Sequence, residues 1–346
     1  MTLAMDVLQR LAAGRALPGG FVSGAELAAA FGVTRSAVWK AIGRLRTLGT
    51  PIDAVTNRGY RLALPTSPLD GAAVKALLPP PLRDALRQGD CAGELDSTNA
   101  QLLARSAPPP GKFDFLTAEF QTAGRGRRGR SWLAPPAGAV CLSWSWTFEA
   151  LSPDMGAYSL AIGVAALRAL RGLGIEGVQL KWPNDLVTPQ GKLAGILIEM
   201  RTESGGPVQV VTGIGMNVAL PAELRLRVAD MGTAAADLAS LAAPLSTAAS
   251  VNSLAPPPAR SALTAALLTE GIGAARQFAR RGFAPFLDEY QAADALRDRP
   301  VTLQGTGPVA GGIARGVDTD GALRVEHGGR IHRIIAGEVS VRTIST

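Results

Sequence analysis

The segment 121–132 constrains this chain more than any other, and it reads Gln-Thr-Ala-Gly-Arg-Gly-Arg-Arg-Gly-Arg-Ser-Trp. Its arginines cannot be buried unaided, because each guanidinium group would need a partner. Arginine presents a planar fork to carboxylates and phosphates, and glycine lets the backbone approach a ligand closely. The segment is therefore either a solvated basic turn, the usual fate of a charge run, or a loop that orders around an anion.

Composition argues against several kinds of site. The two cysteines, Cys91 and Cys141, do not form a disulfide framework, which favours a reducing, cytoplasmic location. The only histidines are His327 and His332, so a zinc site or a histidine-based triad is not expected. No apolar run has the length of a membrane span, and residues 1–14 lack the pattern of a signal peptide.

The net charge of +7 is concentrated at the N-terminus. Residues 1–65 carry eight Lys or Arg against three Asp or Glu. Residues 66–296 carry twenty of each, and residues 297–346 carry seven against five. This distribution predicts a polyanionic partner for the first segment and a small anionic ligand for the neutral middle, which contains the arginine-rich segment.

The first 63 residues have the pattern of a helix-turn-helix followed by a hairpin. Ser23-Gly24-Ala25-Glu26 is a capping box, and Thr34 caps a second helix over Arg35–Leu48. Pro51–Leu64 alternates apolar and polar residues around a turn. The pattern predicts a winged helix that binds DNA in the major groove, with a small helical oligomerisation domain as the alternative. The expected DNA-contacting residues are Ser36, Lys40, Arg44 and Arg58.

The rest of the chain predicts an α+β domain and a small β domain. Prolines at 65, 68 and 79–81 predict a linker at 66–89. We expect a central mixed sheet with helices at 90–296 and a small antiparallel barrel at 297–346. The barrel strands are expected at Pro300–Leu303, Ile313–Val317, Ala322–Glu326, Ile331–Ile335 and Val339–Ile344. Most of the Ala-, Ser- and Pro-rich stretch Thr233–Ala259 is interpreted as a surface loop without a site. Central strands are expected at Leu116–Phe120, Ala139–Phe148, Val178–Trp182, Lys192–Met200 and Val208–Val218, and helices at Met155–Arg171 and Ala262–Leu296.

Four further segments of the central domain carry polar residues at unusual places. Each has an ordinary structural explanation: a helix cap, a tight turn, a solvated lysine and a weakened strand. The four segments are, in the same order, Asp96–Asn99, Lys181–Asp185, Gly191–Glu199 and Gly213–Val218.

Taken together with the arginine-rich segment, these residues resemble biotin protein ligase, in the form that also serves as biotin operon repressor. The resemblance covers nearly the whole chain, and the runs Gly124–Trp132 and Lys181–Leu186 are specific to that family. It implies a winged helix-turn-helix, a biotin/lipoate ligase-like central domain and a small SH3-like C-terminal barrel. It also implies an enzyme that makes biotinyl-5′-AMP from biotin and ATP with Mg²⁺, then biotinylates a lysine of a carboxylase carrier domain.

The resemblance assigns roles residue by residue. It implies that Arg127, Lys192 and Asp185 are catalytic, and Asp185 is also the tentative Mg²⁺ ligand. Asp185 could assist loss of a proton from the attacking amine, hold Mg²⁺ or only support local structure. The implied biotin-binding residues are Ser97, Thr98, Asn99, Gln121, Arg125, Gly126, Arg127, Lys192 and Gly195. The implied nucleotide-binding residues are Arg127, Arg130, Trp132, Asn217 and Arg342.

The same resemblance implies partners and leaves alternatives. The implied partners are a biotin carboxyl carrier domain, operator DNA and a second copy of the chain in a ligand-promoted homodimer, with biotinyl-5′-AMP as corepressor and no membrane. A ligase whose winged helix no longer represses, or a DNA-binding biotin sensor with little ligase activity, are the alternatives. A lipoate ligase is the rival substrate class.

Overall fold

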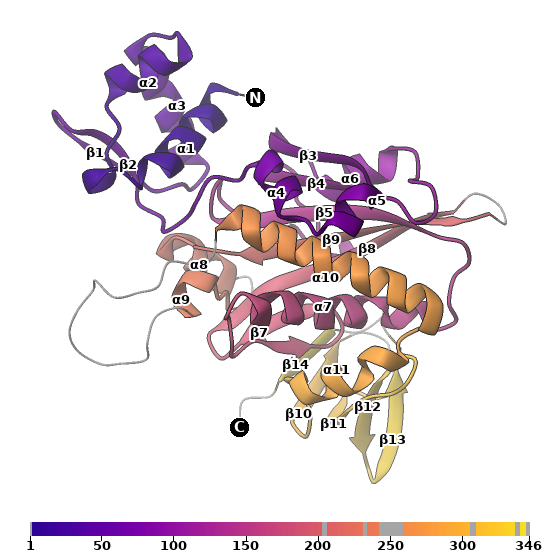
Figure 1. Ribbon diagram of the computed structural model, residues 1–346. Coiled ribbons are helices and arrows are strands. Elements are labelled where there is room, and N and C mark those ends of the chain that lie inside the picture. The colour runs from indigo at the N-terminus through magenta and orange to yellow at the C-terminus, as the bar shows by residue number, and fades with distance from the viewer. Residues whose placement is uncertain are drawn as a thin grey trace.

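Three domains follow one another along the chain in the computed structural model (Figure 1). The structure describes residues 2–202, 206–230, 234–241, 259–304, 309–335 and 340–343. The N-terminal domain and the C-terminal sheet lie at opposite ends of a central body built on a seven-stranded sheet. Among the described residues, no helix combines the length and apolar character needed to cross a membrane.

The N-terminal domain is a winged helix, as predicted. Ser23 Oγ accepts a hydrogen bond from the Glu26 amide, and Thr34 Oγ1 accepts one from the Ala37 amide, so both expected caps form. Asn57 and Gly59 take positive φ in the tight turn of the hairpin. Its elements are α1 Leu3–Gly14, η1 Pro18–Gly20, α2 Gly24–Phe31, α3 Arg35–Thr47, β1 Ile52–Val55 and β2 Gly59–Leu62.

The stretch expected as a linker, 66–89, is ordered and helical over much of its length. It contains α4 Gly71–Leu77 and α5 Pro80–Ala85, and strand β3 begins at Leu86. Val74 and Leu82 are buried in the central core. Pro80 and Pro81 suggested a linker, but they begin α5. Proline suits the first turn of a helix, because a backbone amide there has no hydrogen-bond partner within the helix. These residues therefore pack as part of the central body.

The central sheet has the order β3-β4-β5-β9-β8-β7-β6. Only the β3–β4 pair is parallel, and every other neighbouring pair is antiparallel, so the sheet is mixed as expected. The strands are β3 Leu86–Leu95, β4 Phe113–Gln121, β5 Ala139–Phe148, β6 Gln179–Lys181, β7 Asp185–Thr188, β8 Gly191–Thr202 and β9 Val208–Asn217.

Helices cover both faces of this sheet. The long helices α7 and α10 pack against one face and bury the main apolar core. The short helix α6 lies over the other face, where Leu102 packs on Leu116 and Val211. The bounds of these and the other helices of the central domain are α6 Thr98–Ala104, η2 Arg127–Gly129, η3 Met155–Ala157, α7 Tyr158–Gly172, α8 Ala222–Asp230, α9 Leu238–Leu241, α10 Arg260–Arg281, η4 Ala284–Phe286 and α11 Leu287–Ala293.

The C-terminal domain is a five-stranded antiparallel sheet of order β13-β12-β11-β10-β14. Its alternating sequence gave the right strands to within a few residues. Trp182, in the central domain, donates from Nε1 to the Gly321 carbonyl at 3.1 Å and so ties the two domains together. The strands are β10 Pro300–Gln304, β11 Gly311–Val317, β12 Leu323–His327, β13 Arg330–Ile334 and β14 Ser340–Thr343.

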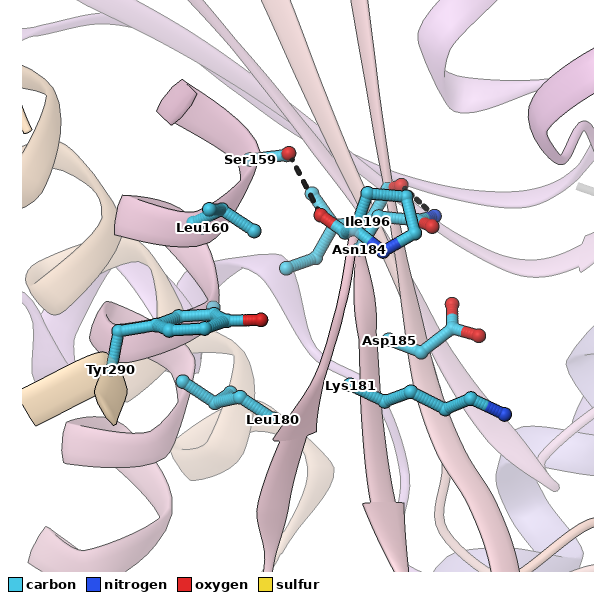
Figure 2. A pocket seen from close by; sticks show the side chains of 10 residues that line it. Ser159, Leu160, Leu180, Lys181, Asn184, Asp185, Ile196 and Tyr290 are labelled. Atoms are coloured by element: carbon cyan, nitrogen blue, oxygen red, sulfur yellow. Dashed lines mark hydrogen bonds between the residues drawn. The ribbon is translucent and has the colours of Figure 1, made fainter. Parts of the chain in front are cut away.

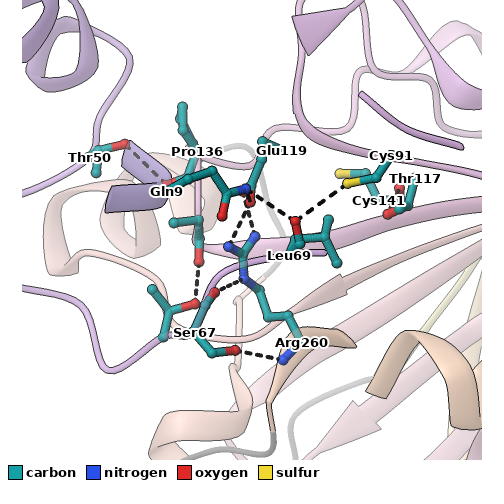
Figure 3. Close-up of polar contacts among 12 residues, drawn as sticks. Gln9, Thr50, Ser67, Leu69, Cys91, Thr117, Glu119, Pro136, Cys141 and Arg260 are labelled. Carbon is teal, nitrogen blue, oxygen red and sulfur yellow. Dashed lines mark hydrogen bonds and ion pairs between the residues drawn. The ribbon is translucent and has the colours of Figure 1, made fainter. Parts of the chain in front are cut away.

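A buried ion pair lies where the winged helix meets the central domain (Figure 3). Arg260, at the start of α10, contacts Glu119 of β4 through two hydrogen bonds of 2.6 and 2.8 Å, and neither side chain is exposed. Gln9 of α1 donates to the same Glu119 carboxylate. Arg260 Nε also donates to the Ser67 carbonyl at 2.8 Å. One carboxylate thus joins the winged helix, β4 and α10.

Replacing Arg260 by Met should destabilise the protein by about 3–5 kcal/mol, because Glu119 would be left buried and charged without its partner. The measurement is the free energy of unfolding from urea titration. Arg10→Met is the matched control, because it removes an exposed ion pair with Glu26 and should cost less than about 1 kcal/mol. Equal losses in the two variants would contradict the structural role given to the buried pair.

Candidate functional site

A cavity of about 1250 Å³ opens on the face of the central sheet that carries α6. The predicted ligand-binding residues come from β3–α6, β4, the arginine-rich segment, β7, β8 and β9, and the fold brings them around this one cavity. Those that line it are Ser97, Thr98, Asn99, Gln121, Arg125, Gly126, Arg127, Arg130, Trp132, Asp185, Lys192, Gly195 and Asn217.

One end of the cavity is a network of neutral polar groups. Gln121 Oε1 accepts from the Thr98 amide at 2.8 Å and from its hydroxyl at 3.1 Å. Ser143 Oγ donates to Asn99 Oδ1 and lies 2.7 Å from Thr98 Oγ1. Ser97, Thr98 and Asn99 are all buried. Such a network offers neutral donors and acceptors at fixed positions, which suits a neutral polar ring.

The cavity floor is open because β9 carries glycine there. The residues Ile214 and Met216 point into the core under α7 and α10, so Gly213 and Gly215 face the cavity. A methyl group on Gly213 would overlap Asn99, and one on Gly215 would overlap the Trp132 indole. These glycines therefore allow Asn99 and Trp132 to lie directly on the strand.

The arginine-rich segment folds back on itself as a tight loop beside the cavity. The Gly126 amide donates to the Arg130 carbonyl at 2.6 Å, and the Trp132 amide donates to the Gly124 carbonyl at 2.9 Å. Arg128 and Gly129 take positive φ at the tip. The loop is thus a defined turn over the cavity and differs from an unstructured solvated run.

Two arginines of this loop are held by groups on the sheet. Arg127 donates to Asn184 Oδ1 at 3.3 Å, and burial lowers the pKa of its guanidinium, with the charge of Arg128 acting in the same direction. Arg125 forms an ion pair with Glu199 at 3.2 Å, and Asn99 Nδ2 donates to the same carboxylate at 2.9 Å.

Lys192 and Asp185 form an ion pair in the cavity wall. Lys192 Nζ lies 2.7 Å from Asp185 Oδ1, and about a quarter of each side chain is exposed. The ammonium also lies 5.9 Å from the centre of the Trp132 ring. The Lys192 amide donates to the Ala234 carbonyl at 2.7 Å, and the Lys192 carbonyl accepts from Ala236 at 2.9 Å.

Residues 234–235 form part of the cavity wall, contrary to what the sequence predicted. We expected Thr233–Ala259 to be a loop without a site, yet Ala234 and Ala235 line the cavity and the backbone there holds Lys192. Composition cannot reveal such a contact, because it is made by the backbone. Residues 233 and 242–258 of that stretch lie outside the described part of the chain.

Two further nucleotide-site predictions have different outcomes. Asn217, at the end of β9, is buried and donates to the Ala236 carbonyl at 2.9 Å and to the Lys192 carbonyl at 3.4 Å. It lines the cavity and also fixes the strand that carries Lys192. Arg342 lies in β14 opposite Thr302, but its side chain is outside the part of the chain that the structure describes.

Sequence reasoning gave no role to Glu199, Ser143 or Asn184, which complete the site. Glu199 receives both Arg125 and Asn99, Ser143 joins Thr98 to Asn99, and Asn184 receives Arg127. A charged residue near the end of an otherwise apolar strand was the available signal for Glu199.

The predicted DNA-contacting residues are exposed, with one qualification. Ser36, Lys40 and Arg58 lie at the surface of α3 and of the hairpin. Arg44 is half-exposed, but its guanidinium donates to both oxygens of Glu94 in β3, at 2.7 and 2.6 Å. In this structure Arg44 therefore contacts the central domain.

The site can hold a neutral polar ring at one end and an extended anion under the arginine loop. Fixed positive charges surround a cavity that is large enough for two reactants.

Comparisons with known proteins identify the domains. The Biotin/lipoate A/B protein ligase family matches residues 94–217, an HTH domain matches 15–61, and the Biotin protein ligase C terminal domain matches 298–342. The bifunctional ligase/repressor BirA of Escherichia coli is 34% identical over 334 residues, which cover 94% of each chain. The chain belongs to the biotin ligase/repressor family. The biotin–[acetyl-CoA-carboxylase] ligase of Mycobacterium tuberculosis is 34% identical over 73% of this chain and 88% of its own.

Solved structures agree on the fold of this family. The biotin protein ligase of Aquifex aeolicus in complex with biotin and ATP superposes with a TM-score of 0.59 at 24% identity. It covers 75% of this chain and 100% of its own.

Behind the site of this ligase, the turn Lys181–Asp185 rests on the segment after α11. Leu180 and Asp294 form a parallel bridge, and the Ala295 amide donates to the Leu180 carbonyl at 2.8 Å. Asp294 Oδ1 accepts from the Leu296 amide at 2.9 Å. Burial raises the pKa of the Asp294 carboxyl to about 6.

Asp294→Asn should stabilise the protein at pH 7.5 and have little effect near pH 4. The raised pKa means that the folded state holds the proton more tightly, so the native protein loses stability as pH rises through about 4 to 6. A shift of about two pH units corresponds to at most about 3 kcal/mol. The measurement is the free energy of unfolding against pH.

The exposed Asp288, on α11, gives the matched control. Asp288→Asn should leave the pH dependence of the native protein in place. If the stability of Asp294→Asn still fell as pH rises from about 4 to 6, that loss of stability would not come from the buried Asp294 carboxylate.

Proposed function

We propose that this protein is an ATP-dependent biotin ligase that forms biotinyl-5′-AMP and transfers biotin to a lysine of a carboxylase carrier domain. Membership of the family and the presence of both ligase domains support it. The single observation that carries it is the cavity, which joins a neutral polar end to an arginine loop and to Lys192. The C-terminal biotin ligase domain favours biotin over lipoate as the acid.

In the first step the biotin carboxylate attacks the α-phosphate of ATP, the bond between the α- and β-phosphates breaks, and pyrophosphate leaves. The carboxylate is already ionised at neutral pH, so this step requires no general base. Thr98, Asn99 and Gln121 bind the ureido ring, because they offer neutral donors and acceptors. Arg125, Arg127 and Lys192 bring the two anions together and stabilise the charge on the phosphate oxygens. Arg130, Trp132 and Asn217 lie where the nucleotide binds.

In the second step the carrier lysine attacks the biotinyl carbonyl carbon, and AMP leaves. The attacking amine must lose a proton, and Asp185 is the carboxylate in the cavity wall that can accept it. Lys192, which pairs with Asp185, turns to the oxygens at the acyl-phosphate. The arginine loop covers the mixed anhydride and limits its exposure to water.

We propose that Mg²⁺ enters as part of the ATP complex. Among the described residues, no group of three or more His, Cys, Asp or Glu side chains could hold a metal ion. The Asp185 carboxylate is engaged by Lys192. These residues do not form a resident metal site, so we assign Asp185 to proton transfer.

Gly213→Ala should raise the KM for biotin by about tenfold, because the added methyl group displaces Asn99 and one polar contact to the ring is lost. The KM for ATP should change less. The measurement is pyrophosphate release with biotin or lipoate as the acid, followed by biotin on the carrier lysine.

Gly273→Ala is the matched control, because a methyl group on this glycine of α10 meets no atom within 4 Å. It should behave as the parent protein. Pyrophosphate release that lipoate supports as well as biotin would overturn the choice of acid. Absence of release with either acid would overturn the ligase itself.

We further propose that the winged helix binds operator DNA and that biotinyl-5′-AMP is the corepressor. The HTH match and the exposed basic residues of α3 and the hairpin support this role. A ligand-promoted homodimer in the cytoplasm would present two such domains. Equal dimerisation constants with and without biotinyl-5′-AMP, measured by sedimentation, would remove the corepressor link.

Lys40→Ala should weaken DNA binding and reduce the slope of log affinity against log salt by about one, because one phosphate contact is lost. Binding of the biotinyl-5′-AMP complex to duplex DNA, measured at several salt concentrations, tests this. Ligation should be unaffected. Lys75→Ala removes an exposed charge from α4 and should leave DNA binding intact. A similar loss of DNA affinity in Lys75→Ala would mean that net charge alone explains the effect.

A further inference from the structure

Glu199, on β8, accepts hydrogen bonds from two donors that belong to different parts of the chain. Arg125 Nη1 donates to its Oε1 at 3.2 Å, and Asn99 Nδ2 donates to its Oε2 at 2.9 Å. Glu199 does not itself line the cavity, whereas Asn99 does. A carboxylate paired with arginine only accepts hydrogen bonds. The nitrogen of the Asn99 amide must therefore face Glu199, and its oxygen must face the other way.

The orientation of Asn99 determines where the neighbouring hydroxyl protons lie. Asn99 Oδ1 accepts the Ser143 hydroxyl proton, so Ser143 has no proton left for Thr98. Ser143 Oγ and Thr98 Oγ1 are 2.7 Å apart, a separation at which a proton must lie between them, and it must come from Thr98. With their protons used in this way, Asn99, Ser143 and Thr98 offer oxygen lone pairs to a ligand in the cavity that they line.

The same groups would also support the opposite direction. If the Asn99 amide were turned over, its nitrogen would donate to Ser143, Ser143 would donate to Thr98, and Thr98 would donate to Gln121 Oε1, which lies 3.1 Å away. Amides and hydroxyls both donate and accept. The direction of this hydrogen-bond chain, from Thr98 through Ser143 to Asn99, is therefore set by the group at its end, which is Glu199.

A second amide beside the arginine loop shows how a backbone acceptor can do this instead (Figure 2). Asn184 Nδ2 donates to the Ile196 carbonyl at 2.8 Å, which leaves its Oδ1 to accept from Arg127. The backbone acceptor near Asn99 Nδ2 is the Leu197 carbonyl, at 3.4 Å. That distance is longer than the usual limit of about 3.2 Å. The orientation of Asn99 therefore depends mainly on Glu199.

We propose that Glu199 is a positioning residue that sets the direction of the hydrogen-bond chain, so that the cavity selects an acid whose ring carries N–H donors. The inference rests on the proposed function, because the ring concerned is the ureido ring of biotin. Arg125 explains why the position needs a carboxylate. A neutral amide at 199 would have one oxygen, which Arg125 would occupy, and its nitrogen would then face Asn99 and turn that amide over.

The test is Glu199→Gln, which keeps the shape of the side chain and reverses the chain. The probes are biotin and its two cyclic carbamate analogues, in which one or the other ring N–H is replaced by oxygen. The parent should prefer biotin, because a ring oxygen that faces lone pairs has no donor. For at least one analogue, the ratio of its dissociation constant to that of biotin should fall by about tenfold or more in Glu199→Gln. Calorimetry measures both constants without turnover.

Glu199→Asp tests shape against hydrogen-bond direction. It shortens the side chain but keeps a group that cannot donate, so it should retain more of the preference for biotin than Glu199→Gln does. A greater loss of preference in Glu199→Asp than in Glu199→Gln would overturn the proposal, as would an unchanged ratio in Glu199→Gln. Glu149→Gln is the matched control, because it makes the same change at an exposed residue just after β5, and it should bind as the parent does.

Pyrophosphate release by the parent protein is measured separately. Absence of release with biotin would contradict the proposed function, whatever the binding ratio. Release with biotin together with an unchanged ratio in Glu199→Gln would reject only the role of Glu199.

Discussion

The pairing of β9 with β5 on one side and β8 on the other positions nearly all of the site. Its register places Gly213 opposite Ser143 and Leu197, and Gly215 opposite Cys141 and Gly195. A slip of one residue would turn Ile214 and Met216 into the cavity and expose the core under α7 and α10. The buried apolar face therefore fixes the register, and the register in turn sets the glycine floor on which Asn99 and Trp132 lie.

Two cations of the site are held in ion pairs with carboxylates. Arg125 pairs with Glu199, and Lys192 pairs with Asp185. Each pair is partly exposed, so it contributes little stability by itself. A phosphate-bearing ligand can thus replace the carboxylate partners of these cations at modest cost. The same carboxylates would then be released within the site, and the proton transfer proposed for Asp185 needs that release.

The sequence predicted what depends on local pattern. The strand Ala139–Phe148 has the predicted bounds, because apolar residues recur along its whole length and every residue in it is buried between neighbouring strands. The polar residues at the ends of β3, β4, β7 and β9 had ordinary structural explanations by themselves, and only the resemblance to a known family assigned them to one site.

What the sequence could not predict depends on contacts between distant segments. Prolines at 79–81 suggested a linker, but helix α4, just before them, packs on α10, and local pattern does not encode that contact. Arg44 has the position of a DNA contact, yet its pairing with Glu94 depends on how two domains meet. The backbone contact of Ala234 and Ala236 with Lys192 left no side-chain signal.

The junction of the winged helix with the central domain bears directly on the arginine loop. Thr50 and Thr66 donate to the carbonyls of Pro136 and Ala137 at 3.1 and 2.8 Å, and Ala137 is buried in the apolar cluster of the winged helix. These carbonyls lie only a few residues beyond Trp132, where the loop ends. The N-terminal domain therefore anchors the chain just beyond the arginine loop. Because only a few residues separate this anchored backbone from Trp132, the position of the winged helix bears on the end of the arginine loop.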